Sequence, residues 1–269
     1  MVTTRRPGHT EPVSSATTAT TAATFGDLLR GWRHHRRLSQ LALSIAADVS
    51  ARHVSFLETG RSSPSRAMVL RLAHVLDVPK HGQNRLLVAA GLAPVYSQLS
   101  FDAPEMSAVR GGVTRVLAAY EPFPCLAVDG GWNILAANPG TAVLLEGVAA
   151  HLLRQPNALR IALHPDGLAP RIANLAQWRG HLLDRLRREV RESGGDDALL
   201  AEIEAYPGGS APTELGGVAV PLELDTVEGG RLTFLSVVTT FGTALDLTAA
   251  ELSIEAFLPA DDDTAAALR

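Results

Sequence analysis

One short segment of the chain carries side chains that can recognise a nucleic acid. Ser50 is a typical N-cap residue, so a helix is expected to begin directly after it. Arg52 and His53 then lie near the N-terminal end of that helix, where side chains can reach base edges in a DNA major groove. Arginine is the commonest partner of guanine O6 and N7. The chemistry on offer is therefore hydrogen bonding to DNA rather than the making or breaking of covalent bonds.

Two short helices joined by a tight turn are predicted to position these side chains. Ser39 is the expected N-cap of the first helix, and Gly60 is a suitable stop for the second. The residues expected to face the core, including the plug of the turn, are Leu41, Ile45, Ala46, Val49, Val54 and Leu57. This is the helix-turn-helix pattern. The alternative is an ordinary pair of amphipathic helices in a small all-helical domain.

The charge of the chain is divided unevenly along its length. The whole chain has a formal net charge of −4. Residues 25–95 hold ten basic against four acidic residues, a net charge of +6, whereas residues 96–269 hold 12 basic and 23 acidic residues. Phosphate neutralisation supplies most of the sequence-independent affinity for DNA. Because the positive charge lies in the segment with the helix-turn-helix pattern, it favours DNA binding over a merely solvated surface.

Three motifs in this segment are more specific than the helical pattern. They are Leu38–Gln40 (LSQ), Val49-Ser50 and Phe56–Arg61 (FLETGR). On these residues the chain resembles the phage-repressor, or XRE-type, helix-turn-helix family. The resemblance implies that Gln40 contacts phosphate, that Arg52 and its neighbours read base edges, and that Arg33 pairs with Glu58. The DNA-binding residues expected are Gln40, Ser50, Ala51, Arg52, His53, Ser55 and Arg61.

Composition limits the remaining possibilities. With 269 residues and 46% apolar content, the chain can bury two cores of ordinary size. No apolar run approaches the roughly 20 residues that span a bilayer, and the N-terminus lacks the apolar stretch of a signal peptide. Cys125 is the single cysteine, so no internal disulfide can form. We therefore expect a cytoplasmic protein that does not bind a membrane.

The pattern beyond the first segment changes from helical to mixed. An amphipathic helix is predicted near 106–120, a hairpin at 122–138 around Gly130-Gly131, a long helix at 171–191, and strands at 217–224, 231–241 and 251–258. The predicted fold is an all-α domain of five helices followed by an α+β domain whose antiparallel sheet is covered by helices. The predicted division is a disordered tail at 1–24, a DNA-binding domain at 25–91, a linker at 92–104, an α+β domain at 105–263 and a tail at 264–269.

Several unusual motifs occur along the second domain. They are Glu121–Pro124 (EPFP), Val128-Asp129, Trp132, Asn138, Leu163–Leu168 (LHPDGL), Asn174–Trp178 (NLAQW), Thr240–Gly242 (TFG) and Glu251–Asp263. On these residues the chain resembles the MmyB-like ligand-binding domain of actinobacterial regulators, which also follows a repressor-type helix-turn-helix. The resemblance implies a PAS-like fold and the binding of an acyl or fatty-acid-like molecule, without identifying the ligand.

Each candidate site residue in the second domain has a structural alternative. The segment His164–Gly167 (HPDG) is interpreted as a turn rather than a catalytic His–Asp pair. Asn138 can anchor a ligand head group or cap the following helix, and tryptophans can line a pocket or belong to the core. Cys125 is expected to be a buried thiol, and Asp261–Asp263 a solvated tail. The ligand-binding candidates are Phe123, Trp132, Asn138, Trp178 and Arg179, the last being one of several arginines on the long helix.

These observations predict a ligand-responsive transcription regulator with no catalytic residues and no cofactor. His34, His35 and His53 lack the spacing of a metal site. We expect a homodimer on a near-palindromic double-stranded operator, with recognition helices about 34 Å apart, and a hydrophobic, fatty-acid-like ligand in the second domain. Two alternatives remain: a DNA-tethered enzyme acting on an acyl or redox substrate, and a regulator whose second domain binds another protein and no ligand.

Overall fold

The computed structural model describes residues 23–193, 198–209, 211, 219–240 and 246–269. The tail expected at 1–24 lies outside these ranges except for its last two residues, and parts of the predicted strands at 217–224 and 231–241 also lie outside them. Within the described ranges, no helix combines the length and the hydropathy needed to cross a bilayer.

Five short helices form the N-terminal domain: α1 (Phe25–His35), α2 (Gln40–Ala46), α3 (Ala51–Glu58), α4 (Arg66–Val75) and α5 (Lys80–Ala89). Serine side chains cap three of them. Ser39, Ser50 and Ser65 accept hydrogen bonds from amides three residues further on, at 3.0, 3.1 and 3.3 Å. Gly60 and Gly91 adopt φ angles of 71° and 73°, a region that favours glycine, directly after α3 and α5.

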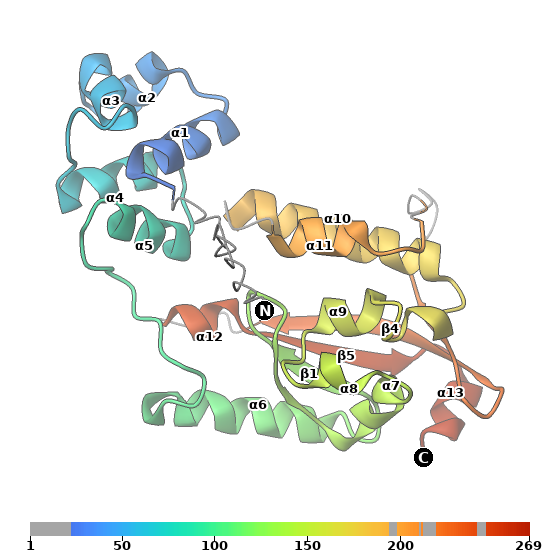
Figure 1. Ribbon diagram of the computed structural model, residues 1–269. Coiled ribbons are helices and arrows are strands. Elements are labelled where there is room, and N and C mark those ends of the chain that lie inside the picture. The colour runs from blue at the N-terminus through green and yellow to red at the C-terminus, as the bar shows by residue number, and fades with distance from the viewer. Residues whose placement is uncertain (1–22, 194–197, 210, 212–218, 241–245) are drawn as a thin grey trace, which may run out of the picture.

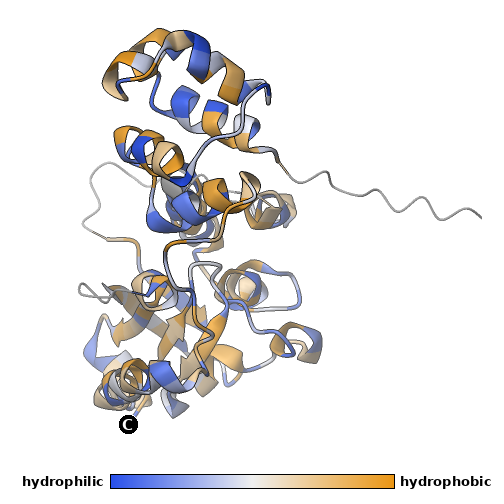
Figure 2. Ribbon diagram, turned by 90° about the vertical axis from the view of Figure 1, so that its left-hand side faces the viewer, coloured by the Kyte–Doolittle hydropathy of each residue, from blue (hydrophilic) through white to orange (hydrophobic). Residues whose placement is uncertain are grey.

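One apolar core holds these five helices together. Figure 2 shows hydrophobic and hydrophilic residues on different sides of the short helices, as expected when each helix buries a single face. The most deeply buried side chains are Leu29, Leu43, Val54, Leu57, Val69, Leu72, Leu76, Leu86 and Leu87. The helix-turn-helix pair α2–α3 is therefore fixed on α1, α4 and α5 rather than free-standing.

The predicted core face of α2 is wrong. Leu41 and Ile45 are 61% and 73% exposed, and Ala46 is also exposed. Leu43 and Ala47 face the core instead, with 0% and 2% exposure. The helix has only seven residues, about two turns, so the spacing of apolar residues alone does not define which side packs inward.

The C-terminal domain is built on one five-stranded antiparallel sheet. Its strands are β1 (Cys125–Val128), β2 (Ile134–Ala137), β3 (Leu222–Asp225), β4 (Arg231–Thr240) and β5 (Ser253–Pro259). Their order in the sheet is β2-β1-β5-β4-β3. The last strand therefore lies at the centre, between the first hairpin and the second. This α+β arrangement and the preceding five-helix domain confirm the predicted fold class.

Helices cover both faces of this sheet (Figure 1). On one face α6 (Ser107–Ala119) packs through Val113 and Leu117 against Ile254 and Ala256 of β5. The other face carries α7 (Ala142–Leu145), α8 (Ala150–Leu153), α9 (Ala158–Leu163), α10 (Leu175–Ser193) and α11 (Ala198–Ala205). The 3₁₀ turns η1, η2 and η3 lie at Pro104–Met106, Pro139–Thr141 and Ala169–Arg171. Side chains that alternate along β5 thus face two different helical layers.

The C-terminal end of the chain forms a helix, and the acidic run Asp261–Asp263 at its start is exposed, as expected. Helix α13 spans Asp262–Ala267 and contacts β4. The Asp261 carboxylate caps it by accepting from the Thr264 amide at 2.7 Å, and the Thr264 hydroxyl accepts from the Thr233 amide at 2.9 Å. The acidic side chains are placed at the start of a helix, where its dipole favours negative charge.

The segment between the two domains is held against helix α12 (Leu247–Glu251). The Leu247 amide donates to the Ser97 carbonyl at 2.9 Å, and the Leu99 amide donates to Asp246 at 3.2 Å. The Thr248 hydroxyl donates to the Leu99 carbonyl at 2.6 Å. Because α12 leads directly into β5, this linker strap, residues 97–99 on 246–248, connects the linker to the central strand of the sheet.

Candidate DNA-binding surface and ligand cavity

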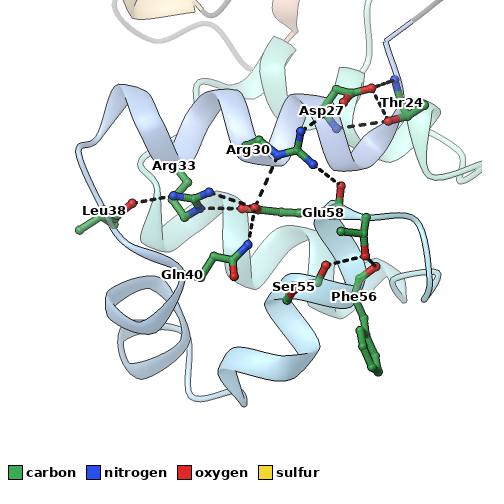
Figure 3. A network of polar contacts seen from close by, with 10 residues as sticks. Thr24, Asp27, Arg30, Arg33, Leu38, Gln40, Ser55, Phe56 and Glu58 are labelled. Carbon is green, nitrogen blue, oxygen red and sulfur yellow. Dashed lines mark hydrogen bonds and ion pairs between the residues drawn. The ribbon is translucent and has the colours of Figure 1, made fainter.

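The carboxylate of Glu58, at the end of α3, is the centre of the N-terminal domain's polar network (Figure 3). Arg33 Nε donates to Glu58 Oε1 at 2.6 Å, and the Arg33 Nη2 donates to Oε2 at 2.9 Å. Gln40 Nε2 donates to the same Oε2 at 2.8 Å, and Arg30 donates to the Glu58 carbonyl at 2.9 Å. The structure therefore brings together the two members of the expected ion pair and adds Gln40 and Arg30 to them.

This network stays charged because its hydrogen bonds outweigh its burial. Burial by itself would raise the pKa of Glu58, but the hydrogen bonds from Arg33 and Gln40 hold it below its usual value. The same hydrogen bond raises the pKa of Arg33. Because these residues come from α1, α2 and α3, one buried carboxylate fixes the orientation of α3 relative to α1 and α2.

The outer face of α3 presents two arginines around one aromatic ring. The Arg52 guanidinium lies 5.1 Å from the Phe56 ring centroid and that of Arg61 lies 6.0 Å from it. Both arginines are exposed. Stacking on a shared ring orders two long cationic side chains in advance of a partner, so less conformational entropy is lost when they bind.

The other expected DNA-binding residues lie on or beside this face. Ala51, His53 and Ser55 are half-buried on α3, whereas Ser50 is exposed and uses its Oγ to cap the helix. Gln40 Nε2 gives one amide N–H to Glu58, and this nitrogen carries a second N–H. All seven expected residues therefore belong to α3, its flanks or the start of α2.

A buried cavity lies between the sheet and the layer of α7, α9 and α10. Its volume is ≈ 60 Å³. Every strand contributes to its wall, through Leu126, Ile134, Leu222, Ser236, Glu255 and Phe257, and the helices add mainly apolar side chains. A wider, open hollow of ≈ 610 Å³ lies under the linker around Gln98–Asp102 and β2. The cavity is smaller than a typical ligand pocket, but its mainly apolar lining with a few polar groups is the lining expected of a small-molecule site.

The cavity has one polar end, formed mainly by α10. Arg185 Nη2 donates to Glu255 Oε1 at 2.7 Å, and its Nε donates to Glu189 Oε1 at 2.9 Å. Its guanidinium also lies 4.3 Å from the Trp132 ring centroid, and the Trp132 indole donates to Glu189 Oε2 at 2.8 Å. His181 completes this end, and burial lowers its pKa. An apolar wall with one polar end suits a ligand with an apolar body and a polar head.

Sequence reasoning placed only two of its five ligand candidates on this wall. Trp132 and Trp178 line the cavity, whereas Phe123 is not among the lining residues. His181, Arg185 and Glu255 were missed. The spacing from Trp178 to residues 181, 182 and 185 marks one face of α10, but the prediction selected Arg179 from the arginines of this helix and not Arg185.

Asn138 is a structural residue rather than a head-group anchor. It is 6% exposed; its Oδ1 accepts from the Cys125 amide at 3.0 Å, and its Nδ2 donates to the carbonyls of Leu117 and Phe123 at 3.1 and 2.9 Å. The capping alternative is not realised either, because the side chain accepts no amide N–H of η2. The residue joins α6, β1 and the turn before β1, so its polar atoms are already used.

Arg179 is also structural. It is only 6% exposed, and its Nη2 donates to the carbonyls of Ile203, Glu204 and Tyr206 at 3.0, 3.0 and 3.1 Å, while its Nη1 donates to that of Gly209 at 3.1 Å. The last carbonyls of a helix lack partners within the helix. Arg179 supplies them for α11, which explains why it points toward α11 and not toward solvent.

Within the part of the chain that the structure describes, the remaining reactive side chains do not form a catalytic arrangement. His164 Nδ1 accepts the Asp166 amide at 3.0 Å but lies 3.9 Å from the Asp166 carboxylate, as in a turn. With His151 these residues bring three donor atoms within 4.8 Å, yet the Nδ1 lone pair is occupied. Cys125 is fully buried, and burial, with Glu255 nearby, raises the pKa of its thiol to about 11. It is therefore protonated at neutral pH and a poor nucleophile.

A helix-turn-helix domain with an exposed basic face, joined to an α+β domain with a mainly apolar cavity, defines a ligand-sensing transcription regulator. Residues 109–269 match the family "MmyB-like transcription regulator ligand binding domain", and residues 24–86 match a helix-turn-helix domain family. The chain belongs to the MmyB-like transcription regulators.

Comparison with curated proteins and solved structures adds little to these family matches. No curated protein gives a significant match. A solved structure described as "Structure of an RNA-binding Light-Oxygen-Voltage Receptor" is 14% identical with a TM-score of 0.27, and the match covers 91% of this chain and 60% of that one. The chain thus spans less than two thirds of that protein, and a similarity this low carries no argument about function.

Proposed function

We propose that this cytoplasmic regulator acts as a homodimer on a near-palindromic operator and senses a hydrophobic, fatty-acid-like molecule. The exposed pair Arg52 and Arg61, braced by Phe56, supports base and phosphate recognition by α3. One α3 helix contacts only a few base pairs, so two copies are needed to specify an operator, with the recognition helices about 34 Å apart.

The mainly apolar cavity is the observation that carries the ligand proposal. Its ≈ 60 Å³ holds only a few water molecules. An alkyl chain therefore enters only if α7, α9 and α10 move away from the sheet. Such a ligand binds the opened arrangement in preference to the closed one, and this difference in affinity is the requirement for a ligand to shift a conformational equilibrium.

The linker strap offers a route from the cavity to the DNA-binding domain. Glu255 and Phe257 of β5 line the cavity, and α12 directly before β5 holds Ser97 and Leu99 of the linker. His81 of α5 also lies 3.2 Å from Glu251, at the end of α12. Movement of β5 on ligand entry would thereby change the position of the DNA-binding domain in each protomer.

The rival proposals are an enzyme and a protein-interaction module. Among the described residues, Arg185 is paired with Glu255 and Glu189 at the polar end of the cavity, and no nucleophile is held beside a base. We therefore favour binding without conversion. A turnover assay on extracted lipids distinguishes the enzyme, since steady product formation would establish it.

The proposal is tested with purified full-length protein. Mass spectrometry of a denatured sample identifies any molecule that co-purifies, and calorimetry of the ligand-free protein measures binding of straight-chain alkyl compounds of increasing length. Affinity is expected to rise by roughly 0.8 kcal/mol per CH₂ until the cavity is full. Selection of binding sites from random DNA should return inverted repeats. Absence of heat and of thermal stabilisation at every chain length would remove the ligand proposal and favour the interaction module.

A further inference from the structure

Glu255 has an unusual position for a carboxylate. It lies on the central strand β5, is 4% exposed, and lines the cavity. Its Oε1 accepts from Arg185 at 2.7 Å. No hydrogen bond to its Oε2 is found within the described part of the chain. Because Glu255 lines the cavity, this oxygen can accept a hydrogen bond from a bound molecule.

The charges around Glu255 leave the polar end of the cavity negative. Arg185 is the single cation on the cavity wall among the described residues, and it is paired with two carboxylates, Glu255 and Glu189. Arg185 and Glu255 cancel on the wall itself, and Glu189, which is half-exposed beside the wall, brings the formal charge of the three-residue cluster to −1. The other polar wall residues, Thr141, Ser236 and His181, do not change this sign, because burial lowers the pKa of His181 and favours its neutral form.

The Arg185 guanidinium is not free to reorganise around an incoming anion. It is stacked on Trp132 at 4.3 Å, and Trp132 is itself tied to Glu189 by its indole N–H. A ligand carboxylate placed at this end would lie beside the second carboxylate oxygen of Glu255. The two negative charges would repel each other, because no proton is shared between them. A head group that donates a hydrogen bond would instead satisfy that oxygen.

We propose that the molecule sensed by this protein carries a neutral or cationic hydrogen-bond donor as its head group, such as an alcohol, amide or ammonium, which donates to Glu255 Oε2. Within the fatty-acid-like class proposed above, the site then favours long-chain alcohols, amides or amines over the free carboxylate anion. This inference rests on the proposed function, because it specifies the polar end of a ligand whose apolar body occupies the same cavity.

The test compares four eight-carbon probes that differ only in head group: octanoate, 1-octanol, octanamide and octylammonium. Calorimetric titration of the full-length protein at neutral pH should show octanol, octanamide and octylammonium binding at least about tenfold more tightly than octanoate, which corresponds to about 1.4 kcal/mol. Octylammonium and octanoate carry charges of equal size, so their comparison separates the sign of the charge from hydrophobicity.

The variant Glu255→Gln keeps the shape of the side chain and removes its charge. It should narrow the ratio of octylammonium to octanoate affinity by about tenfold. Glu204→Gln, which alters a surface ion pair with Arg187 on α11, is the control and should leave the ratio unchanged. The ratio remains informative if both affinities fall, because a general loss of packing affects the two probes alike.

Each outcome decides a different question. Equal affinities for the four probes, or tightest binding of octanoate, would overturn the head-group inference while leaving ligand binding intact. A ratio that Glu255→Gln does not change would also overturn it. Absence of binding by all four probes, together with longer alkyl chains, would instead remove the proposed function on which it rests.

Discussion

Glu58 joins three helices through one buried carboxylate. It is 3% exposed and receives hydrogen bonds from Arg33 and Gln40, so removal of either ionic partner leaves a charge in the core. The same Gln40 is the residue expected to touch phosphate. Contact with DNA and stability of the domain are thus coupled at the level of single side chains.

Replacement of Glu58 by Gln should destabilise the protein by about 3–5 kcal/mol at neutral pH, the usual cost of breaking a buried pair. The folded-state pKa of Glu58 is lowered, so its contribution is fully present above its ordinary pKa and is lost as pH falls through the folded value. Urea unfolding of wild type and variant should therefore converge in acid. A difference that stays constant across this range would contradict the assignment.

A double-mutant cycle supplies the control for this prediction. Arg33→Met with Glu58→Gln should be less harmful than the sum of the single changes, whereas the exposed pair Arg231–Asp225 should show little coupling.

Arg52 and Gln40 should affect DNA binding in different ways. Arg52→Ala should weaken operator binding by about 1–3 kcal/mol and relax the preference at one position per half-site. Gln40→Ala should weaken all sequences more evenly, because a phosphate contact carries no sequence information. Titration against the selected operator and single-base variants distinguishes the two. Unchanged preference in Arg52→Ala would show that α3 sits in the groove in another register.

At the scale of elements, the contact between α1 and α3 depends on the absence of a side chain. A Cβ at Gly26 would lie 2.4 Å from the Glu58 carbonyl oxygen, so α1 can approach α3 this closely only with glycine. Asn138 and Arg179 also determine how elements pack, since each supplies hydrogen bonds to backbone groups of neighbouring elements.

Gly26→Ala should therefore destabilise the N-terminal domain and weaken DNA binding, because α1 and α3 must separate. Gly31, in the same helix, is the matched control: a Cβ there meets nothing within 4 Å. Gly31→Ala should stabilise the helix by up to about 1 kcal/mol. Thermal unfolding of both variants checks the prediction, and similar effects of the two substitutions would show that the α1–α3 contact is not tight.

At the scale of the molecule, the linker strap is the element that lets one domain influence the other. The sheet places its last strand at the centre, so α12 and β5 contact both the cavity and the linker. Allosteric coupling energies are typically about 1–3 kcal/mol. The loss of one or two hydrogen bonds of ordinary strength is enough to remove such a coupling.

Thr248→Val removes the hydroxyl that donates to the Leu99 carbonyl and keeps the shape of the side chain. Ligand affinity should be unchanged, but the effect of ligand on operator affinity should fall toward none. Thr248→Ser, which retains the hydroxyl, should behave like wild type. Operator titrations with and without 1-octanol measure this, and full coupling in Thr248→Val would show that the signal follows another route.

The sequence by itself determined the features that depend on local chemistry. N-cap serines and glycine stops follow from short motifs, and the five N-terminal helices and the five strands occur in the predicted order. The caps and stops are specified by neighbouring residues, whose hydrogen bonds and backbone angles do not depend on the rest of the chain. The pairing of Arg33 with Glu58 joins two helices and was expected from the family resemblance alone.

Only the tertiary structure decided which side of each helix faces the core, the solvent or a neighbouring element. In α2 it exposed Leu41 and Ile45, and in α10 it turned Arg179 to the end of α11 and Arg185 to the cavity. A long polar side chain is equally compatible with solvent, a helix end or a buried carboxylate until its partner is known. Glu255 and Arg185 are 70 residues apart in sequence, so their meeting, and the polar end of the cavity that they form, exists only in the folded chain.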